Sequence, residues 1–173
     1  MTEDLVDSIA AAWRAEMPAI VGPEFELIKR VARLHNLFAD VLVKQLAPYG
    51  VTRAEYDILS ALRSTGEPYR LRPTDLSERL LLTSGGTSNA LRKLAAAQLV
   101  DREPDPEDAR SSWVRLTALG VETAQAVVEA AVGAQLSVLG PVDADATAKA
   151  AEGLREVLVA LGDRRPHALA RPR

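Results

Sequence analysis

The segment between residues 72 and 116 constrains the fold of this chain more than any other part of the sequence. Arg72–Leu80 has apolar residues at helical spacing, and Pro73 stands in the first turn, where a missing backbone N–H removes no hydrogen bond. A turn over Thr83–Gly86 follows, and Thr87–Leu94 is predicted as a second short helix with Ser84 as its N-cap. Two short helices joined by a tight, glycine-containing turn form a helix-turn-helix pattern.

A β-hairpin is predicted directly after this pattern. Leu99–Glu103 is predicted as a short strand, and Ser112–Leu116 alternates as a returning strand does. The polar loop Pro104–Asp108 between them is interrupted by proline. A hairpin that follows a helix-turn-helix is a wing. The region therefore predicts a winged helix-turn-helix lobe with a two-stranded wing.

Longer helices are predicted on both sides of this lobe. Apolar residues recur at helical spacing over 5–16, 25–46, 52–62, 117–139 and 143–161. Thr52 and Glu55 form a capping box at the start of one of these helices, and Thr117 caps another. The predicted fold class is mostly α (α+β), with the lobe joined to a helical dimerisation region, because the apolar stripes exceed what one small lobe can bury.

The same pattern divides the chain into four parts. We expect residues 1–48 to form an N-terminal extra helix and the first dimerisation helix, 52–116 the winged helix-turn-helix lobe, 117–162 the C-terminal dimerisation helices, and 163–173 a flexible tail. On the C-terminal helices, the residues predicted to lie in a shared interface or its supporting core are Ala130, Leu136, Leu139, Leu154, Leu158 and Leu161.

Composition excludes several classes of protein. The chain has 173 residues, no cysteine and only two histidines, so disulfides, thiol chemistry and cysteine-based zinc sites are excluded and a histidine-rich metal site is not expected. No nucleophile, phosphate-loop or dinucleotide motif is present, which argues against an enzyme and predicts no cofactor. No run approaches the ~18 apolar residues of a membrane span, and the N-terminus is acidic, so we expect a cytoplasmic protein with no membrane partner.

Charge is distributed unevenly along the chain. The formal net charge is −3, yet residues 70–102 contain six basic and three acidic residues and so carry +3, which leaves −6 on the remainder. The basic residues of this stretch are Arg70, Arg72, Arg79, Arg92, Lys93 and Arg102. Because local charge determines which surface attracts a polyanion, the helix-turn-helix segment is the part expected to face nucleic acid.

The wing and its flanks carry a specific motif. Asp105–Arg110 is followed by Val114–Gly120, which contains Val-Arg-Leu-Thr-Ala-Leu-Gly. These residues resemble the wing signature of the MarR family of transcriptional regulators, Asp-x-Arg followed by Val-x-Leu-Thr-x-x-Gly. Arg72–Leu76 resembles the start of the family's helix-turn-helix, and Leu99-Val100-x-Arg102 resembles the entry to its wing.

Two positions depart from the family pattern. Ala109 stands where many members have a second wing arginine. The absence of this arginine would weaken contact with phosphates or the minor groove. Gln98 stands where a glycine usually ends the recognition helix, in a turn that glutamine tolerates less well than glycine. Neither departure changes the resemblance.

The resemblance implies a homodimer that binds double-stranded promoter DNA, with repression expected. Two recognition helices related by a two-fold axis imply a pseudo-palindromic operator with half-sites about one helical turn apart. Serine, threonine, asparagine, arginine and lysine side chains supply hydrogen bonds to base edges and phosphates. The residues expected at the DNA are Arg72, Thr74, Ser84, Gly86, Thr87, Ser88, Asn89, Arg92, Lys93, Asp108, Arg110 and Ser111.

Two alternatives stay open at this point. Arg110 at the wing tip either enters a narrow minor groove or forms an ion pair with Asp108 that holds the hairpin. The chain as a whole is either a DNA-binding regulator or a helical dimerisation protein whose winged helix does not read DNA. Trp113 is expected to pack rather than to stack on bases.

The N-terminal segment resembles the extra helix of the urate-responsive branch of the family. That branch combines a tryptophan, an aspartate and two arginines in its pocket, and Trp13, Asp57 and Arg102 match three of them. Ala90 replaces the remaining arginine and is expected to leave room for a bulkier or less anionic ring than urate. The resemblance implies a small aromatic or phenolic ligand. Alternatively, Trp13 packs the extra helix and Asp57 caps a helix or pairs with Arg102.

Overall fold

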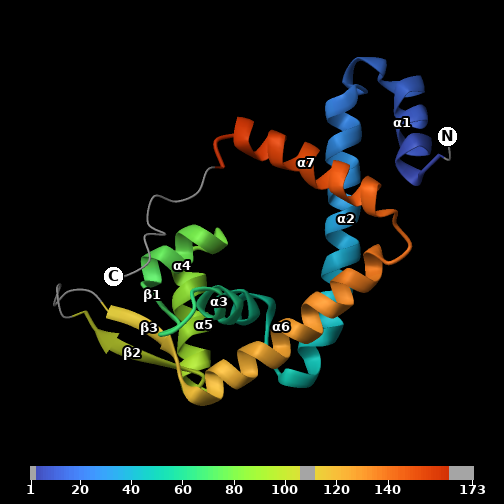
Figure 1. Cartoon of the computed structure of the whole chain (residues 1–173). Helices are drawn as coiled ribbons and strands as arrows, with labels where there is room; N and C mark the ends of the chain where they lie inside the picture. The colour runs from blue at the N-terminus through green and yellow to red at the C-terminus, as the bar shows by residue number, and fades with distance from the viewer. Residues whose placement is uncertain (1–2, 106–111, 164–173) are drawn as a thin grey trace.

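A computed structural model describes residues 3–105 and 112–163, and it consists of a winged lobe from which long helices extend (Figure 1). In chain order the elements are α1 (Leu5–Glu16), η1 (Pro18–Ile20), α2 (Pro23–Leu46), η2 (Ala47–Tyr49), α3 (Arg53–Ser64), β1 (Arg70–Leu71), α4 (Pro73–Leu80), α5 (Ser84–Ala96), β2 (Val100–Pro104), β3 (Ser112–Leu116), α6 (Ala118–Leu139) and α7 (Ala144–Ala160). The prediction of a mostly helical winged helix-turn-helix fold is confirmed.

The helix ends follow from local capping. The predicted capping box of α3 is present, since Thr52 Oγ1 accepts from the backbone N–H of Glu55 and Glu55 Oε2 accepts from that of Thr52 at 2.8 Å. Thr117 caps α6 as predicted, and its Oγ1 lies 2.9 Å from the backbone nitrogen of Gly120. The prediction of Ser84 as the N-cap of α5 is wrong by one residue, because Thr83 Oγ1 accepts from Gly86 N–H at 3.1 Å.

The sheet has three antiparallel strands in the order β1-β3-β2. The predicted hairpin of β2 and β3 is confirmed, with Val100 opposite Leu116 and Arg102 opposite Val114. The prediction of only two strands is incomplete, because β1 adds a third strand along β3 with Arg70 opposite Arg115. A strand of two residues is too short to show an alternating pattern in the sequence.

The hydrophobic core lies inside the lobe, between α3, the sheet and the two helices of the helix-turn-helix. Ile58, Leu59 and Leu62 of α3 are 0% exposed, as are Leu76 of α4 and Val114 of β3. The α6 helix packs against α2 and α3, and it buries Ala124, Val127 and Ala131 there. This core holds the lobe as one rigid support for the surfaces described below.

The end of α5 contains the backbone conformation that favours glycine. Gln98 has φ +59°, and the backbone N–H of Leu99 donates to Leu94 O at 2.9 Å across the end of the helix. The family resemblance placed a glycine at this position. The chain therefore uses a glutamine in a left-handed turn that a glycine would adopt without a steric cost.

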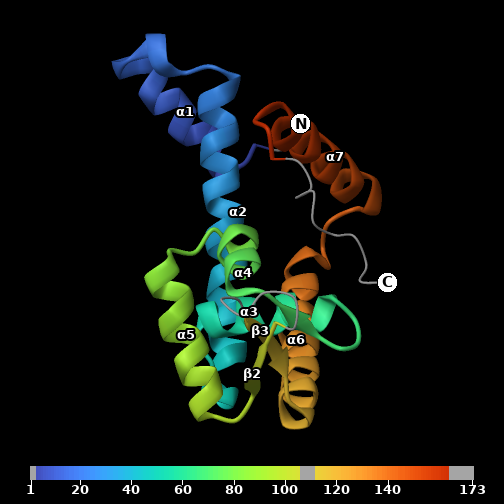
Figure 2. The ribbon, with the colours of Figure 1, turned by 90° about the vertical axis from the view of Figure 1, so that its left-hand side faces the viewer.

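The helices outside the lobe leave apolar surface uncovered. α7 buries none of its residues against the described part of the chain, and Leu158 and Leu161 are 47% and 77% exposed. On α2, Ile28 is 65% exposed and Val43 is 62% exposed. Figures 1 and 2 show α7 standing away from the lobe and α1 lying against the far end of α2.

Within the described residues, no single helix is long and apolar enough to cross a membrane. The helices α6 and α7 reach the required length and composition only when taken together, and they are bent by 110° at the break between them.

Candidate nucleic-acid interface

The outer face of α5 carries most of the predicted DNA-facing residues. In Figure 2, α5 lies at the edge of the lobe opposite α6. One side of the helix is buried and contributes Ala90, Leu91 and Leu94 to the core. The other side is exposed and consists of Ser84, Gly85, Gly86, Ser88, Asn89 and Arg92. We name these six residues the α5 outer face.

Arg92 and Asn89 form a pair on this face. Arg92 Nη2 donates to Asn89 Oδ1 at 2.7 Å, one helical turn away. The asparagine amide retains both of its N–H donors for another partner, and the guanidinium retains several of its own. The pair therefore offers a group of donors and an acceptor that match the edges of base pairs in a major groove.

Thr87 does not belong to the outer face. The sequence placed it among the DNA contacts, but its side chain is 2% exposed. Thr87 Oγ1 lies 3.0 Å from Ser77 Oγ of α4, a hydroxyl–hydroxyl hydrogen bond between the two helices of the helix-turn-helix. The prediction for Thr87 is corrected accordingly, because this residue joins α4 to α5 and cannot reach DNA.

Lys93 points toward another part of the lobe. Its Nζ lies 3.7 Å from Oε1 of Glu55, and the Glu55 side chain is 8% exposed. Glu55 is also the capping-box residue of α3. Lys93, which the sequence placed among the DNA contacts, therefore pairs with a buried carboxylate in this structure, and it would reach DNA only by leaving that ion pair.

The remaining predicted contacts lie near the start of α4 and in the wing loop. Thr74 is exposed in the first turn of α4. Arg72 precedes α4, and its Nη2 lies 2.6 Å from Oδ2 of Asp105, whose side chain is 2% exposed. The predictions for Asp108, Arg110 and Ser111 lie outside the described residues.

The predicted ligand cluster is not assembled within one chain. Trp13 is 41% exposed and packs edge-to-face on Phe25, with the ring centroids 6.5 Å apart. Asp57 pairs with Arg53 at 2.9 Å on the same helix. Arg102 is exposed on β2. Figures 1 and 2 both place α1 at the opposite end of α2 from the lobe that carries Asp57 and Arg102.

The expectation that Ala90 leaves room for a ligand is also corrected. Ala90 is 4% exposed and lies in the hydrophobic core. The space beside its methyl group is filled by core side chains. An arginine at this position would place a guanidinium inside the lobe, which is costly unless the charge is paired.

A cluster of charges fastens α1 to α2. Arg30 of α2 lies 2.9 Å from Asp4, 2.7 Å from Asp7 and 2.8 Å from Glu26. The hydrogen bonds that Arg30 donates to Glu26 and then to Asp4 raise the pKa of Arg30 above its ordinary value. Desolvation opposes ionisation of Asp4, but the hydrogen bonds from Arg30 and from the backbone of Asp7 and Val6 lower its pKa overall. This network holds the N-terminal helix in place on α2.

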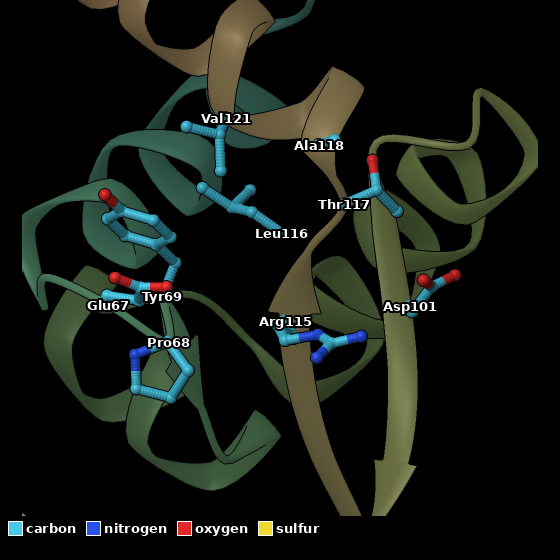
Figure 3. Close-up of a pocket in the computed structure, with 9 residues that line it drawn as sticks. All are labelled: Glu67, Pro68, Tyr69, Asp101, Arg115, Leu116, Thr117, Ala118 and Val121. Atoms are coloured by element: carbon cyan, nitrogen blue, oxygen red, sulfur yellow. The ribbon is translucent and has the colours of Figure 1, made fainter.

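A pocket of about 400 Å³ lies between the wing and the start of α6 (Figure 3). Tyr69, Leu116 and Val121 group together on one side of it. Arg115 is its only lining cation among the described residues, and its Nη1 lies 2.7 Å from Glu103 Oε1. Because Glu67 and Asp101 also line this pocket, its charge does not favour an anionic ligand.

Sequence comparison relates the chain to transcriptional regulators. Residues 49–111 match the profile described as "MarR family". HTH-type transcriptional regulator PecS of Dickeya dadantii (strain 3937) is 29% identical over 136 residues, which cover 79% of this chain and 82% of PecS.

Structural comparison leads to the same group of proteins. Sco5413, a MarR family transcriptional regulator from Streptomyces coelicolor, superimposes with a TM-score of 0.69 at 25% identity, covering 82% of this chain and 96% of Sco5413. A mutant MarR from E. coli complexed with operator DNA superimposes with a TM-score of 0.68 at 21% identity, covering 90% of this chain and 99% of that one. At 21% identity, the similarity to the E. coli protein shows a shared fold.

Proposed function

We infer that this chain, which belongs to the MarR family of winged helix-turn-helix transcriptional regulators, binds a pseudo-palindromic operator as a homodimer and represses transcription there. The observation that carries the proposal is the α5 outer face, which is polar, carries Arg92 and Asn89, and stands on a fully buried core. A rigid helix with exposed hydrogen-bonding groups is what a major groove admits and reads.

The dimer part of the proposal is supported by the uncovered apolar helices. An apolar groove of about 240 Å³ lies between α2 and α6, and its lining residues are Phe38, Val132, Gln135, Leu136 and Leu139. A contiguous exposed apolar surface on a folded protein is typical of a protein interface. A second copy would cover the groove and α7 together, since the two-fold symmetric contact that forms most homodimers pairs the same elements of both copies.

Two dimer-related lobes would then present two α5 outer faces to one side of a duplex. Such an arrangement requires half-sites about one helical turn apart, or a multiple of that spacing. The E. coli relative that superimposes on this chain was crystallised with operator DNA. Occupation of a promoter by the dimer would exclude the transcription machinery from it, which is the basis of the proposed repression.

The proposal extends to release by a small aromatic or phenolic ligand. Its support is the resemblance of Trp13, Asp57 and Arg102 to the pocket residues of the urate-responsive branch. Within one chain, Trp13 lies far from Asp57 and Arg102. The ligand site therefore requires a dimer that brings α1 of one protomer to the lobe of its partner. With Trp113→Phe protein, unchanged Trp13 fluorescence across a panel of aromatic acids and phenols would remove this part of the proposal.

Gly85 provides a test in which stability and DNA binding change in opposite directions. It lies in the first turn of α5, and a Cβ there would meet nothing within 4 Å. Gly85→Glu is expected to stabilise the fold by about 0.5–1 kcal/mol, because helical glycine is unfavourable and a carboxylate suits a helix N-terminus. The same carboxylate would face the phosphates, so we expect operator affinity to fall at least ~10-fold.

The matched control is Gly85→Gln, which has nearly the same shape without the charge. Its affinity should lie between those of the wild type and Gly85→Glu, and fluorescence anisotropy with a duplex enriched from a random pool by the wild-type protein measures all three. Wild-type affinity in Gly85→Glu would mean that α5 does not face DNA. That result would favour a helical dimerisation protein whose winged helix has another use.

A further inference from the structure

The side chain of Trp113 contacts two arginines near the loop end of the wing hairpin, where Trp113 lies opposite Glu103. The guanidinium carbons of Arg70 and Arg72 each lie 4.8 Å from the centre of the indole ring. Trp113 belongs to β3, Arg70 belongs to β1, and Arg72 immediately precedes α4. Cation–π contact with both arginines therefore joins the wing to the first helix of the helix-turn-helix.

The carboxylates of Glu103 in β2 and of Asp105 just after it pair with the same arginines. Arg72 Nη2 lies 2.6 Å from Asp105 Oδ2, and Arg70 Nη1 lies 3.5 Å from Glu103 Oε2. Glu103 also pairs with Arg115 of β3 at 2.7 Å. We name Arg70, Arg72, Glu103, Asp105 and Trp113 the wing clamp, because these residues connect β1, β2, β3 and the start of α4.

We propose that the wing clamp sets the position of the wing relative to α4 and α5, and that Arg72 and Trp113 are positioning residues for DNA binding. The proposal rests on the proposed function. It reassigns Arg72, which the sequence placed among the direct DNA contacts. It also assigns a role to Trp113, which the sequence indicated only as a packing residue.

The burial of Asp105 argues against a direct DNA contact by Arg72. The Asp105 side chain is 2% exposed, so a move of Arg72 to a phosphate would take this partner away from a buried carboxylate. Arg72 is also held from a second direction by the indole ring at 4.8 Å. Both contacts hold the guanidinium against the wing, while 39% of the Arg72 side chain stays exposed.

A fixed position of the wing strands matters for binding because two separate elements must meet the duplex at once. The α5 outer face is one of them, and the chain runs from Asp105 directly into residues 106–111, where the wing contacts are predicted. A wing that is already ordered before binding loses less conformational entropy on the DNA. Loosening the wing clamp should therefore weaken binding without removing any contact to DNA.

The test compares Arg72→Gln, Asp105→Asn and Trp113→Leu on a duplex enriched from a random pool by the wild-type protein. We expect each to lower affinity about 5–10-fold while the slope of log Kobs against log salt stays at the wild-type value. The losses of the two single variants should combine to less than their product in Arg72→Gln/Asp105→Asn, because both changes break the Arg72–Asp105 contact. Arg72→Lys keeps a positive charge for Asp105 and should recover part of the affinity.

Arg92→Gln is the matched control, since it removes an arginine from the α5 outer face. In the double variant Arg92→Gln/Asp105→Asn, the fold losses of affinity of the two single variants should multiply, because the two residues act independently. The proposal is overturned if Arg72→Gln makes the salt slope shallower by about 0.9 and Asp105→Asn binds like the wild type, because that pattern identifies a phosphate contact.

Fluorescence separates failure of the wing clamp from failure of the proposed function. In a Trp13→Phe background, Trp113 is the single tryptophan. Compared with the Trp13→Phe protein, the emission of Trp113 should change when Arg72→Gln is added and stay the same when Arg92→Gln is added. This expectation holds whether or not the protein binds any duplex. Unchanged Trp113 emission in Arg72→Gln would overturn the wing clamp, whereas loss of binding by the wild type would overturn only the proposed function.

Discussion

Ending the chain after Pro141 is expected to abolish the dimer and operator binding together. The deletion removes α7, which buries no residue against the described chain but carries Leu158 and Leu161 at 47% and 77% exposure. A monomer would present a single α5 outer face, and losing the second linked contact should lower operator affinity by ~10²–10⁴-fold. Sedimentation velocity measures the assembly, and anisotropy with the enriched duplex measures binding.

The fold of the lobe should survive this deletion, because α7 contributes nothing to its core. Circular dichroism should show a helical protein that still unfolds cooperatively. A chain ending after Asp163 is the control, and it should stay dimeric because it retains all of α7. A protein that ends at Pro141 and still sediments as a dimer would show that α7 is not part of the interface.

Gly120→Ala is expected to destabilise the lobe by about 3 kcal/mol or more, because it overpacks a site with no room to adjust. A Cβ at Gly120 would lie 1.9 Å from the carbonyl oxygen of Leu99. That oxygen already accepts a hydrogen bond from the backbone N–H of Thr117 at 3.1 Å. Because the oxygen belongs to the backbone, it cannot turn away as a flexible side chain would. For a chain of this size, the loss corresponds to a melting temperature about 6–12 °C lower in a thermal scan.

Gly133→Ala is the matched control on the same helix. A Cβ there would meet nothing within 4 Å, so the change should leave the melting temperature unchanged or raise it slightly. Equal melting temperatures for Gly120→Ala and the wild type would mean that α6 does not approach the strand entry as closely as the structure places it. The glycine of the wing motif would then have no packing role.

The elements that the sequence predicted well are those set by local chemistry. The capping box at Thr52 and the cap at Thr117 each depend on residues three positions apart, so their signal is complete within one turn of helix. The wing hairpin was visible because the second strand alternates and a proline-containing loop separates it from the first. The glycine-favouring turn at Gln98 was predicted from the resemblance and is present at φ +59°.

The features that the sequence missed depend on contacts between distant elements. Thr87 is polar and lies on a helix predicted to face DNA, and only the packing of α4 on α5 shows that it is buried. The sequence suggested open space beside Ala90, because the residues that bury it belong to other elements of the core. The pairing of Arg72 with Asp105 spans 33 residues, and no local pattern indicates it.

The candidate ligand site shows the same limit more strongly. Matching Trp13, Asp57 and Arg102 one by one does not reveal that α1 lies at the far end of α2 from the lobe. The charge network around Arg30 that holds α1 there joins residues 26 positions apart in sequence. Such a placement follows from tertiary packing, which residue-by-residue resemblance does not encode.

Site-directed cleavage of DNA from the α5 outer face tests whether this face lies in the groove. The chain contains no cysteine, so Ser88→Cys introduces a single attachment point for an iron chelate that cleaves nearby DNA. With the enriched duplex, we expect two symmetric cleavage clusters about one helical turn apart from Ser88→Cys, and none from Glu24→Cys at the far end of α2. Cleavage from Glu24→Cys with an uncut duplex from Ser88→Cys would contradict this expectation.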